Sequence, residues 1–340
     1  MKYSALFGAL TVTGLAATGA SAQSTLETVQ DRGELVCGVN TGLTGFAEQG
    51  ADNEWTGFDV ALCKAVAAAV LGDASAVSYV PTTSTDRFDL LTSGRIDMLS
   101  RNTTWTYSRD VDLAMDFAGV NYYDGQGFMV RSDMGVGSAT ELDGATICIQ
   151  SGTTTELNLA DYFATNGMSF TAQSGETNAE LEQAFLAGSC DAYTTDASGL
   201  AATRASFPNP DDYIILPEII SKEPLGPATR ENDSDWTDIV AWTLNALIAA
   251  EELGVTSDNV EEMASADNEN PEVRRLLGVE GDLGQMMGLD NDWAVNVISA
   301  TGNYGEIFEE FLGESTPIGL ARGLNAQWTD GGLLYAPPFR

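Results

Sequence analysis

The sequence contains no histidine among its 340 residues. This absence excludes His-dependent catalytic triads, His-ligated metal sites and the usual proton shuttle near neutral pH. Basic residues are also scarce, since 15 Lys and Arg stand against 50 Asp and Glu and give a formal net charge of −35. An excess of this size repels phosphate backbones and anionic membranes, so we expect no nucleic-acid partner.

Long apolar runs are absent except at the start of the chain. Lys2 precedes an uncharged, largely apolar stretch over 5–17, and Ala20-Ser21-Ala22 has the small residues of a cleavage site. This pattern predicts a signal peptide over 1–22, and the alternative of a membrane anchor is disfavoured because the stretch is short and diluted by Gly and Thr. We therefore expect a soluble, exported protein.

The chain has only four cysteines, Cys37, Cys63, Cys148 and Cys190, and no two of them have CxxC spacing. We therefore expect no metal and no other cofactor. Four cysteines in an exported chain allow three disulfide pairings. Pairing neighbours along the chain, Cys37 with Cys63 and Cys148 with Cys190, closes two local loops and is favoured, with four buried free thiols as the alternative.

Hydrophobic residues make up 44% of the chain, which is enough for one large or two modest cores. Short β-like runs alternate with amphipathic helical runs, the pattern of an α/β fold. The predicted helices cover 58–71, 87–92, 155–166, 177–187, 197–205 and 236–254. The predicted strands cover 35–39, 77–81, 96–100, 127–130, 145–150, 168–172, 190–193 and 213–216.

This alternation stops and restarts, which predicts two lobes joined by a hinge of two crossings, near 126–131 and 221–227. The expected lobe 1 combines 23–126 with 228–340, and the expected lobe 2 covers 127–227. Pro224 and Pro227 give the second crossing the character of a rigid linker. The last segment, 255–340, should add short helices and a tail that cover lobe 1.

Threonine and serine gather directly after four predicted strands, in 82–87, 101–106, 151–156 and 194–196. The crevice beyond the carboxyl ends of such strands is where α/β sheets bind ligands, so these segments predict a cleft for a small polar molecule. Helix capping is the alternative interpretation: Thr153 with Glu156 fits a capping box, Asp196 fits an N-cap, and Ser84 or Thr85 could cap the helix at 87.

Two arginines do not fit a helix-capping or surface role easily. Arg87 falls in the first turn of its predicted helix, where the helix dipole disfavours a cation. Arg109 follows a Trp and a Tyr. These aromatic side chains would exclude water from a bidentate contact between Arg109 and a carboxylate, which would strengthen that contact. Surface ion pairing is the alternative for each. Arg109 with Thr104 and the N–H groups near Thr154 could hold an α-carboxylate, and Asp196 an α-ammonium, which together describe an amino acid.

Several motifs resemble the family 3 periplasmic solute-binding proteins, the amino-acid receptors of ABC importers. The matching segments are Gly57-Phe58-Asp59, Arg87-Phe88-Asp89-Leu90-Leu91, Gly94-Arg95-Ile96-Asp97, 102–109, Ser151-Gly152-Thr153-Thr154 and 191–196. Further segments resemble the general L-amino-acid branch: Ser100-Arg101-Asn102-Thr103-Thr104-Trp105-Thr106, Tyr122-Tyr123-Asp124-Gly125-Gln126-Gly127-Phe128, Gly323-Leu324-Asn325 and Tyr335-Ala336-Pro337-Pro338. The resemblance covers nearly the whole chain after the expected signal peptide.

The resemblance implies a two-lobed, type II periplasmic-binding-protein fold and a monomer in the periplasm that delivers amino acids to a membrane permease. It places Arg109 on the ligand carboxylate and Asp196 on the ammonium, with Asn102, Ser151 and Gly152 also in the binding set. Relatives of this branch take many amino acids, or glutamate, glutamine, aspartate and asparagine.

The resemblance also bears on the ligand's side chain. It implies that Arg87, helped by Ser84, meets a distal carboxylate, whereas Asn40 stands where many members have a carboxylate for the ammonium. A dehydratase on the same fold and a sensory module without transport are the alternative functions.

Overall fold

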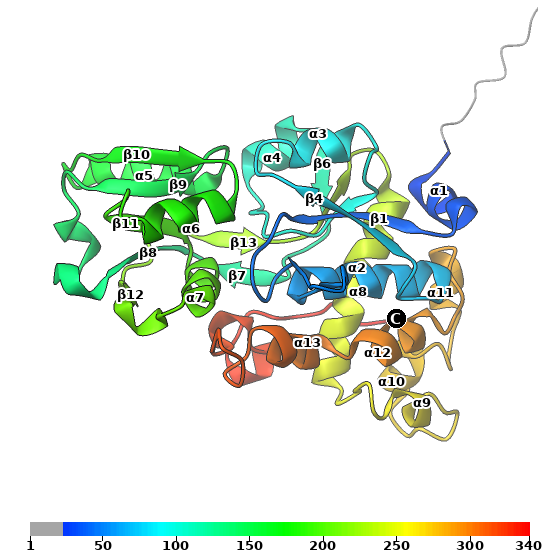
Figure 1. The fold of residues 1–340 in the computed structure, drawn as a ribbon. Coiled ribbons are helices and arrows are strands. Elements are labelled where there is room, and N and C mark those ends of the chain that lie inside the picture. Colours follow the sequence, from blue (N-terminus) through cyan, green and yellow to red (C-terminus); the bar gives the residue numbers. More distant parts are fainter. Residues whose placement is uncertain (1–22) are drawn as a thin grey trace, which may run out of the picture.

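The computed structural model describes residues 23–340 and has two lobes of unequal size, each built around one sheet (Figure 1). The predicted signal peptide over 1–22 lies outside the described residues. We call the lobe that contains strand β1 lobe 1 and the lobe that contains strand β9 lobe 2. Within residues 23–340, no helix combines the length and the apolar character that a membrane span requires.

The sheet of lobe 1 has five strands, in which β1 is parallel to its neighbours β4 and β5, and β14 is antiparallel to its neighbours β5 and β6. Helix α2 (Phe58–Leu71) is buried on nearly all sides because it packs between this sheet and the helices α8 (Ser234–Glu252) and α12 (Trp293–Thr301). The strand order is β4 (Val77–Thr82), β1 (Leu35–Asn40), β5 (Met98–Leu99), β14 (Ala228–Arg230) and β6 (Met115–Phe117). Lobe 1 therefore combines segments far apart in the sequence.

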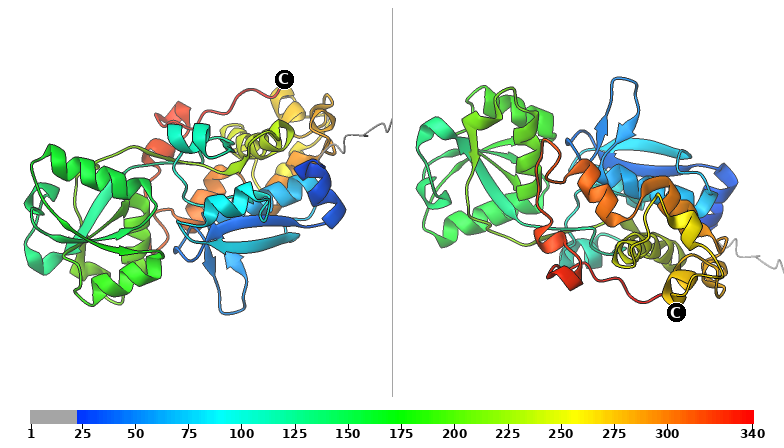
Figure 2. Two further views of the ribbon diagram at one scale, coloured as in Figure 1. Left: turned by 90° about the horizontal axis from the view of Figure 1, so that it is seen from above. Right: turned by 90° about the horizontal axis from the view of Figure 1, so that it is seen from below.

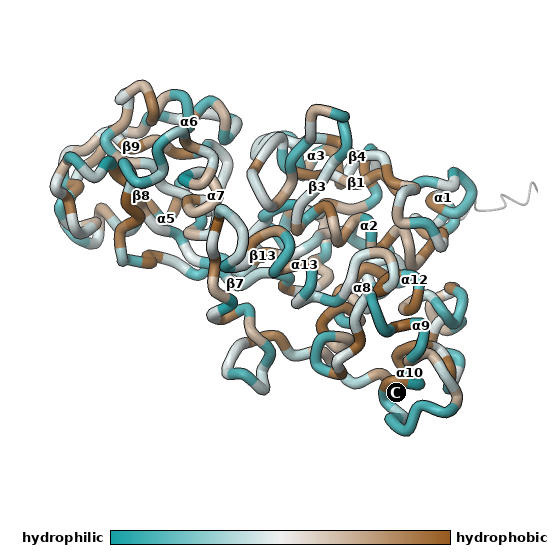
Figure 3. Tube along the Cα trace, turned by 60° about the horizontal axis from the view of Figure 1, so that its bottom comes forward, coloured by the Kyte–Doolittle hydropathy of each residue, from teal (hydrophilic) through white to brown (hydrophobic). Residues whose placement is uncertain are grey.

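The sheet of lobe 2 also has five strands, of which one, β8, is antiparallel to both of its neighbours and the other four run in one direction. Its order is β10 (Thr171–Gly175), β9 (Thr146–Gln150), β11 (Ala192–Asp196), β8 (Gln126–Arg131) and β12 (Tyr213–Ile215). Its helices are α5 (Thr154–Thr165), α6 (Asn178–Leu186) and α7 (Ala197–Ser206). In Figure 3 the hydrophobic colour runs along β8, inside this lobe.

Two short antiparallel strands, β7 (Tyr122–Asp124) and β13 (Glu223–Leu225), connect the lobes (Figure 1). The segment 221–227, predicted as a rigid linker, contains strand β13, and β14 follows it closely. Proline at 224 is compatible with a strand that has a single partner. The connection between the lobes is thus a hydrogen-bonded ribbon.

The C-terminal segment packs against lobe 1, as Figure 2 shows from above and below. Helices α12 (Trp293–Thr301) and α13 (Tyr304–Phe311) both contact α2 and α8 (Ser234–Glu252). Farther on, the Asn325 side chain accepts a hydrogen bond from the Tyr123 N–H at 2.7 Å and donates one to the Tyr123 carbonyl oxygen at 3.1 Å. The C-terminal segment is therefore bonded directly to a strand that connects the lobes.

Several short elements complete the described chain. The other helices are α1 (Thr25–Arg32), α3 (Arg87–Thr92), α4 (Tyr107–Asp112), α9 (Val260–Met263), α10 (Pro271–Leu276) and α11 (Leu283–Met286). A small hairpin pairs β2 (Glu48–Gln49) with β3 (Trp55–Thr56). The 3-10 turns cover Ser132–Met134, Ala139–Glu141, Pro210–Asp212, Gly323–Asn325 and Trp328–Asp330.

The predicted helices 58–71 and 87–92 have the observed bounds, and five predicted strands differ from the observed ones by at most one residue at each end, whereas three differ by more. The strand expected over 96–100 pairs only at Met98 and Leu99, and the one expected over 190–193 spans Ala192–Asp196. The strand expected over 168–172 begins at Thr171, because this edge strand is set by its register with β9 rather than by apolar residues. The favoured disulfide pairing is confirmed: Cys37 is bonded to Cys63, and Cys148 to Cys190.

Candidate functional site

A cavity lies between the lobes, where the strands of both sheets end. Residues after β5, together with α3 and α4, line it from lobe 1, whereas residues after β9 and at the end of β11 line it from lobe 2. Its lining consists of Arg87, Arg101, Asn102, Thr104, Arg109, Gln150, Thr153, Thr154, Thr155, Thr195 and Asp196. The cavity therefore has the polar, two-sided character predicted from the serine and threonine clusters.

Arg109 enters the cavity from the short helix α4, whose N-cap Thr106 accepts a hydrogen bond from the Arg109 N–H. Its guanidinium is buried, donates to the Thr104 carbonyl oxygen at 2.9 Å and lies 5.2 Å from the ring of Phe88. Burial lowers the pKa of Arg109. The alternative of a surface ion pair is wrong, and the side chain is placed to bind an anion.

Asp196 lies at the end of β11 and at the start of α7, but its side chain makes no capping hydrogen bond. The capping interpretation therefore does not account for this residue. Its carboxylate is buried, lines the cavity and accepts a long hydrogen bond of 3.5 Å from Asn102 Nδ2. Burial, together with the charges of Asp124 and Glu223, raises its pKa well above the usual value. An ammonium group at this point would stabilise the ionised form.

Arg87 is only 2% exposed, so the alternative of surface pairing is wrong for this residue as well. Its Nη1 donates to Thr103 Oγ1 at 3.3 Å, and its guanidinium carbon lies 4.6 Å from the Phe88 ring centre. Burial and the positive charges of Arg101 and Arg109 lower its pKa well below the usual range. Arg87 is therefore a second cation facing the cavity.

Lobe 2 contributes the N-terminus of α5. Thr153 is the N-cap and accepts from the Glu156 N–H at 3.3 Å, but Glu156 accepts from the Gly152 N–H, so the predicted capping box is only half formed. Thr154 Oγ1 lies 3.2 Å from Thr104 Oγ1 of lobe 1. The first turn of a twelve-residue helix thus faces Arg109 and Thr104 across the cleft.

Four residues expected in the site, Ser84, Ser151, Gly152 and Asn40, are not among those that line the cavity. Ser84 does not cap α3, whose N-cap is Asp86; its Oγ donates to the carbonyl oxygen of Ser151 at 2.7 Å. Gly152 lies at this same contact, where an added Cβ would come within 3.4 Å of Thr85. Ser84, Ser151 and Gly152 therefore belong to a contact between the two lobes at the edge of the cleft.

Asn40 lies behind the cavity lining. Its Nδ2 donates to Asn102 Oδ1 at 2.9 Å, and its Oδ1 accepts from the Gly42 N–H at 3.1 Å. The Asn102 amide is held in this orientation, so that its own Nδ2 points to Asp196. Asn40 therefore positions Asn102, and Asn102 extends the polar surface around Asp196.

Two important residues were missed by sequence reasoning. Glu223, on strand β13, is 1% exposed and accepts hydrogen bonds from Thr104, Thr154, Asn158 and Ser221. Arg101, directly after β5, is 2% exposed and lines the cavity. Glu223 lies in the predicted linker and gave no signal, whereas Arg101 could have been found from its place beside Asn102 in the polar segment 101–106.

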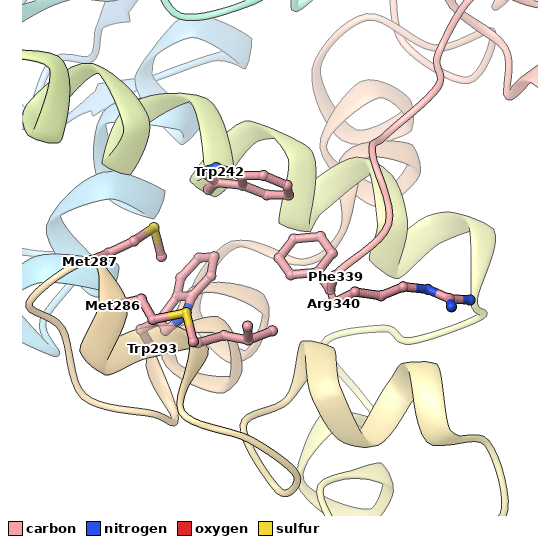
Figure 4. A pocket seen from close by; sticks show the side chains of 7 residues that line it. Trp242, Met286, Met287, Trp293, Phe339 and Arg340 are labelled. Carbon is pink, nitrogen blue, oxygen red and sulfur yellow. The ribbon is translucent and has the colours of Figure 1, made fainter.

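An apolar pocket lies elsewhere, between helix α8 and the C-terminal segment (Figure 4). Trp242, Trp293 and Phe339 line it with two methionines, and the Phe339 ring meets Trp242 edge-on at 5.1 Å. Arg340 is the one charged residue among those that line this pocket, so the lining offers no two side chains of opposite charge. The cleft between the lobes is therefore the candidate site for a zwitterion.

The sequence matches the model of the bacterial extracellular solute-binding proteins, family 3, over residues 35–259. The protein belongs to this family. It is 62% identical, over the full length of both chains, to the glutamate/glutamine/aspartate/asparagine-binding protein BztA of Rhodobacter capsulatus. It is 58% identical to the general L-amino acid-binding periplasmic protein AapJ of Rhizobium johnstonii, covering 95% of this chain and 96% of the relative.

Among solved structures, a periplasmic binding protein of Brucella ovis with glutathione bound is 54% identical, with a TM-score of 0.91. The match covers 94% of this chain and 100% of that one. These findings confirm the predicted family and the two-lobed, mixed α/β periplasmic-binding-protein fold. The relatives are binding proteins, so the protein is a binding protein and the alternative of a dehydratase is not supported.

Proposed function

We propose that this protein binds one free L-amino acid in the cleft between its lobes and prefers glutamate, glutamine, aspartate and asparagine. It is the periplasmic amino-acid-binding component of an ABC importer. The observation that carries the proposal is that Arg109 of lobe 1 and Asp196 of lobe 2 line the same buried cavity. Two relatives that match nearly the whole chain are named for binding these four amino acids or L-amino acids in general.

Each end of the amino acid has its own partners in this proposal. The α-carboxylate is held by the Arg109 guanidinium, by Thr104 and by the N-terminus of α5 at Thr154, since a helix N-terminus and a guanidinium both favour anions. The α-ammonium is held by the carboxylate of Asp196, with Asn102 beside it. Arg87 faces the end of the ligand's side chain.

Binding is coupled to closure of the cleft. The ligand's carboxylate meets partners from both lobes, so the ligand stabilises the closed state more than the open one. Lobe 2, whose predicted range 127–227 includes the hinge segments, turns as one body about the ribbon of β7 and β13, which pairs two segments that run between the two sheets. The closed protein, acting as a monomer, then docks on the permease subunits and releases its amino acid.

Isothermal titration calorimetry with the twenty amino acids and glutathione tests the proposal. Asp196→Asn and Arg109→Met should each weaken the binding of every amino acid by about a hundredfold or more, because each leaves one charge of the ligand unpaired in a buried site. The matched control, Asp211→Asn, changes an exposed carboxylate of lobe 2 and should bind normally. Unchanged affinity in Asp196→Asn would refute the proposed site.

A further inference from the structure

A third arginine faces the ligand cavity, and no role has been assigned to it. Arg101 lies between Ser100, at the end of the β5 segment, and Asn102. It is 2% exposed and lines the cavity with Arg87 and Arg109. Its Nε and Nη2 atoms are buried and have no hydrogen-bond partner among residues 23–340. A buried guanidinium with free donors is costly unless a ligand completes its hydrogen bonds.

The protein itself does not neutralise these three arginines by direct contact. Within the described part of the chain, no carboxylate oxygen lies within 4 Å of the guanidinium nitrogens of Arg87, Arg101 or Arg109. Asp59 is the acidic group that acts most strongly on Arg101, but burial raises the pKa of Asp59 to about 7. Asp59 therefore offsets only part of the positive charge of Arg101 at neutral pH.

The charges in the cavity do not balance for a simple zwitterion. Three guanidiniums and one carboxylate, Asp196, line the space. A zwitterionic ligand adds one carboxylate and one ammonium, and the buried Glu223 behind Thr104 and Thr154 acts on Arg109. Arg87 and Arg101 then have no anionic partner in the cavity lining. Burial lowers the pKa of Arg87 and of Arg101, and the positive charges of neighbouring arginines lower both further, Arg101 and Arg109 acting on Arg87 and Arg109 acting on Arg101. The excess of positive charge matches a ligand with a second anionic group.

We propose that Arg101 is a specificity-determining residue that, together with Arg87, binds a second anionic group at the end of the ligand's side chain. The site then prefers α-amino acids with a distal carboxylate or sulfonate over the corresponding amides. This inference rests on the proposed function, because it assumes that Arg109 and Asp196 hold the two ends of the amino acid. It adds a ranking, in which glutamate and aspartate bind more tightly than glutamine and asparagine.

The test compares glutamate, glutamine, aspartate, asparagine and cysteate by calorimetry in wild type, Arg101→Gln and Arg101→Lys. Wild type should prefer glutamate to glutamine. Arg101→Gln should weaken glutamate, aspartate and cysteate binding by about tenfold to a hundredfold, the usual effect of losing a charge-assisted hydrogen bond, and change glutamine binding by less than about threefold. Arg101→Lys should restore part of the preference. Arg95→Gln, at an exposed position of lobe 1, is the matched control.

A structural role for Arg101 would give a different result. The melting temperature of ligand-free Arg101→Gln should equal or exceed that of wild type, because the variant removes an unpaired buried charge. A fall in melting temperature with equal loss of glutamate and glutamine binding would overturn the proposal, and so would an unchanged glutamate preference. If wild type bound none of these amino acids, the proposed function itself would fail, an outcome that the unmodified protein reveals before any variant is made.

Discussion

Ser84 Oγ of lobe 1 donates a hydrogen bond of 2.7 Å to the backbone carbonyl oxygen of Ser151 in lobe 2. Two other contacts join the lobes nearby: Asn178 Nδ2 donates to the Gly42 carbonyl oxygen at 3.3 Å, and the hydroxyls of Thr104 and Thr154 lie 3.2 Å apart. All three require the cleft to be closed. The structure is therefore the closed form, and these contacts stabilise it.

The Ser84 contact predicts a general effect on affinity. Ser84→Ala removes a hydrogen bond that exists only in the closed state, so every bound amino acid should bind about fivefold to tenfold more weakly, as expected for about 1 kcal/mol. Calorimetry with glutamate and glutamine measures this loss, and Ser75→Ala at an exposed turn serves as the control. A loss confined to glutamate and aspartate would instead support the role as a partner of the ligand's distal carboxylate.

Glu223 predicts a coupled loss of stability and binding. Its carboxylate accepts from Thr104 of lobe 1 at 2.5 Å and from Thr154 of lobe 2 at 2.8 Å, and its other oxygen accepts from Asn158 and Ser221. Glu223→Gln replaces one acceptor oxygen with a donor nitrogen, so two of these hydrogen bonds are lost. We expect about tenfold weaker binding of all ligands and a melting temperature lower by several degrees.

Differential scanning calorimetry and titration calorimetry on the same preparations measure both effects of Glu223→Gln. Glu231→Gln, at an exposed position of lobe 1, controls for the change in net charge. Normal binding and an unchanged melting temperature in Glu223→Gln would show that the hydrogen bonds of Glu223 on strand β13 contribute neither to ligand affinity nor to stability.

Asp59 predicts a stability difference that depends on pH. Burial raises its pKa from 3.8 to about 7, so the folded state binds this proton more tightly than the unfolded state does. The folded state is therefore favoured below the unfolded pKa and loses that advantage as the pH rises from about 4 to about 7. Asp59→Asn, which carries no charge at any pH, should melt several degrees above wild type at pH 8 and close to it at pH 4.

Thermal unfolding of both proteins across pH 4–8 measures this effect. Asp238→Asn changes an exposed carboxylate of α8 and should show no comparable trend. A constant difference between Asp59→Asn and wild type over the whole range would mean that the carboxyl of Asp59 has the same pKa in the folded and unfolded states.

Local sequence patterns were sufficient to predict those helices and strands that have a long apolar run or a clear end residue. Helix α2 was predicted to the residue because it is a long apolar run that ends at Gly72, where φ is +69°. Strands β6, β7 and β13 were missed because each spans only three residues and pairs with a segment distant in the sequence. Their formation depends on partners that sequence spacing does not reveal.

The sequence by itself determined the chemistry of the protein: an exported, acidic chain without histidine, two lobes, and the motifs that carry Arg109 and Asp196. Only the tertiary structure decided which side chains share the cavity. In the folded protein Ser84 bonds to the backbone of lobe 2, and Asn40 bonds to Asn102. Arg101 and Glu223 are both buried. The physical reason is that residue type fixes charge and hydrogen-bonding capacity, whereas burial and partnership arise only when segments far apart in the chain meet across the cleft.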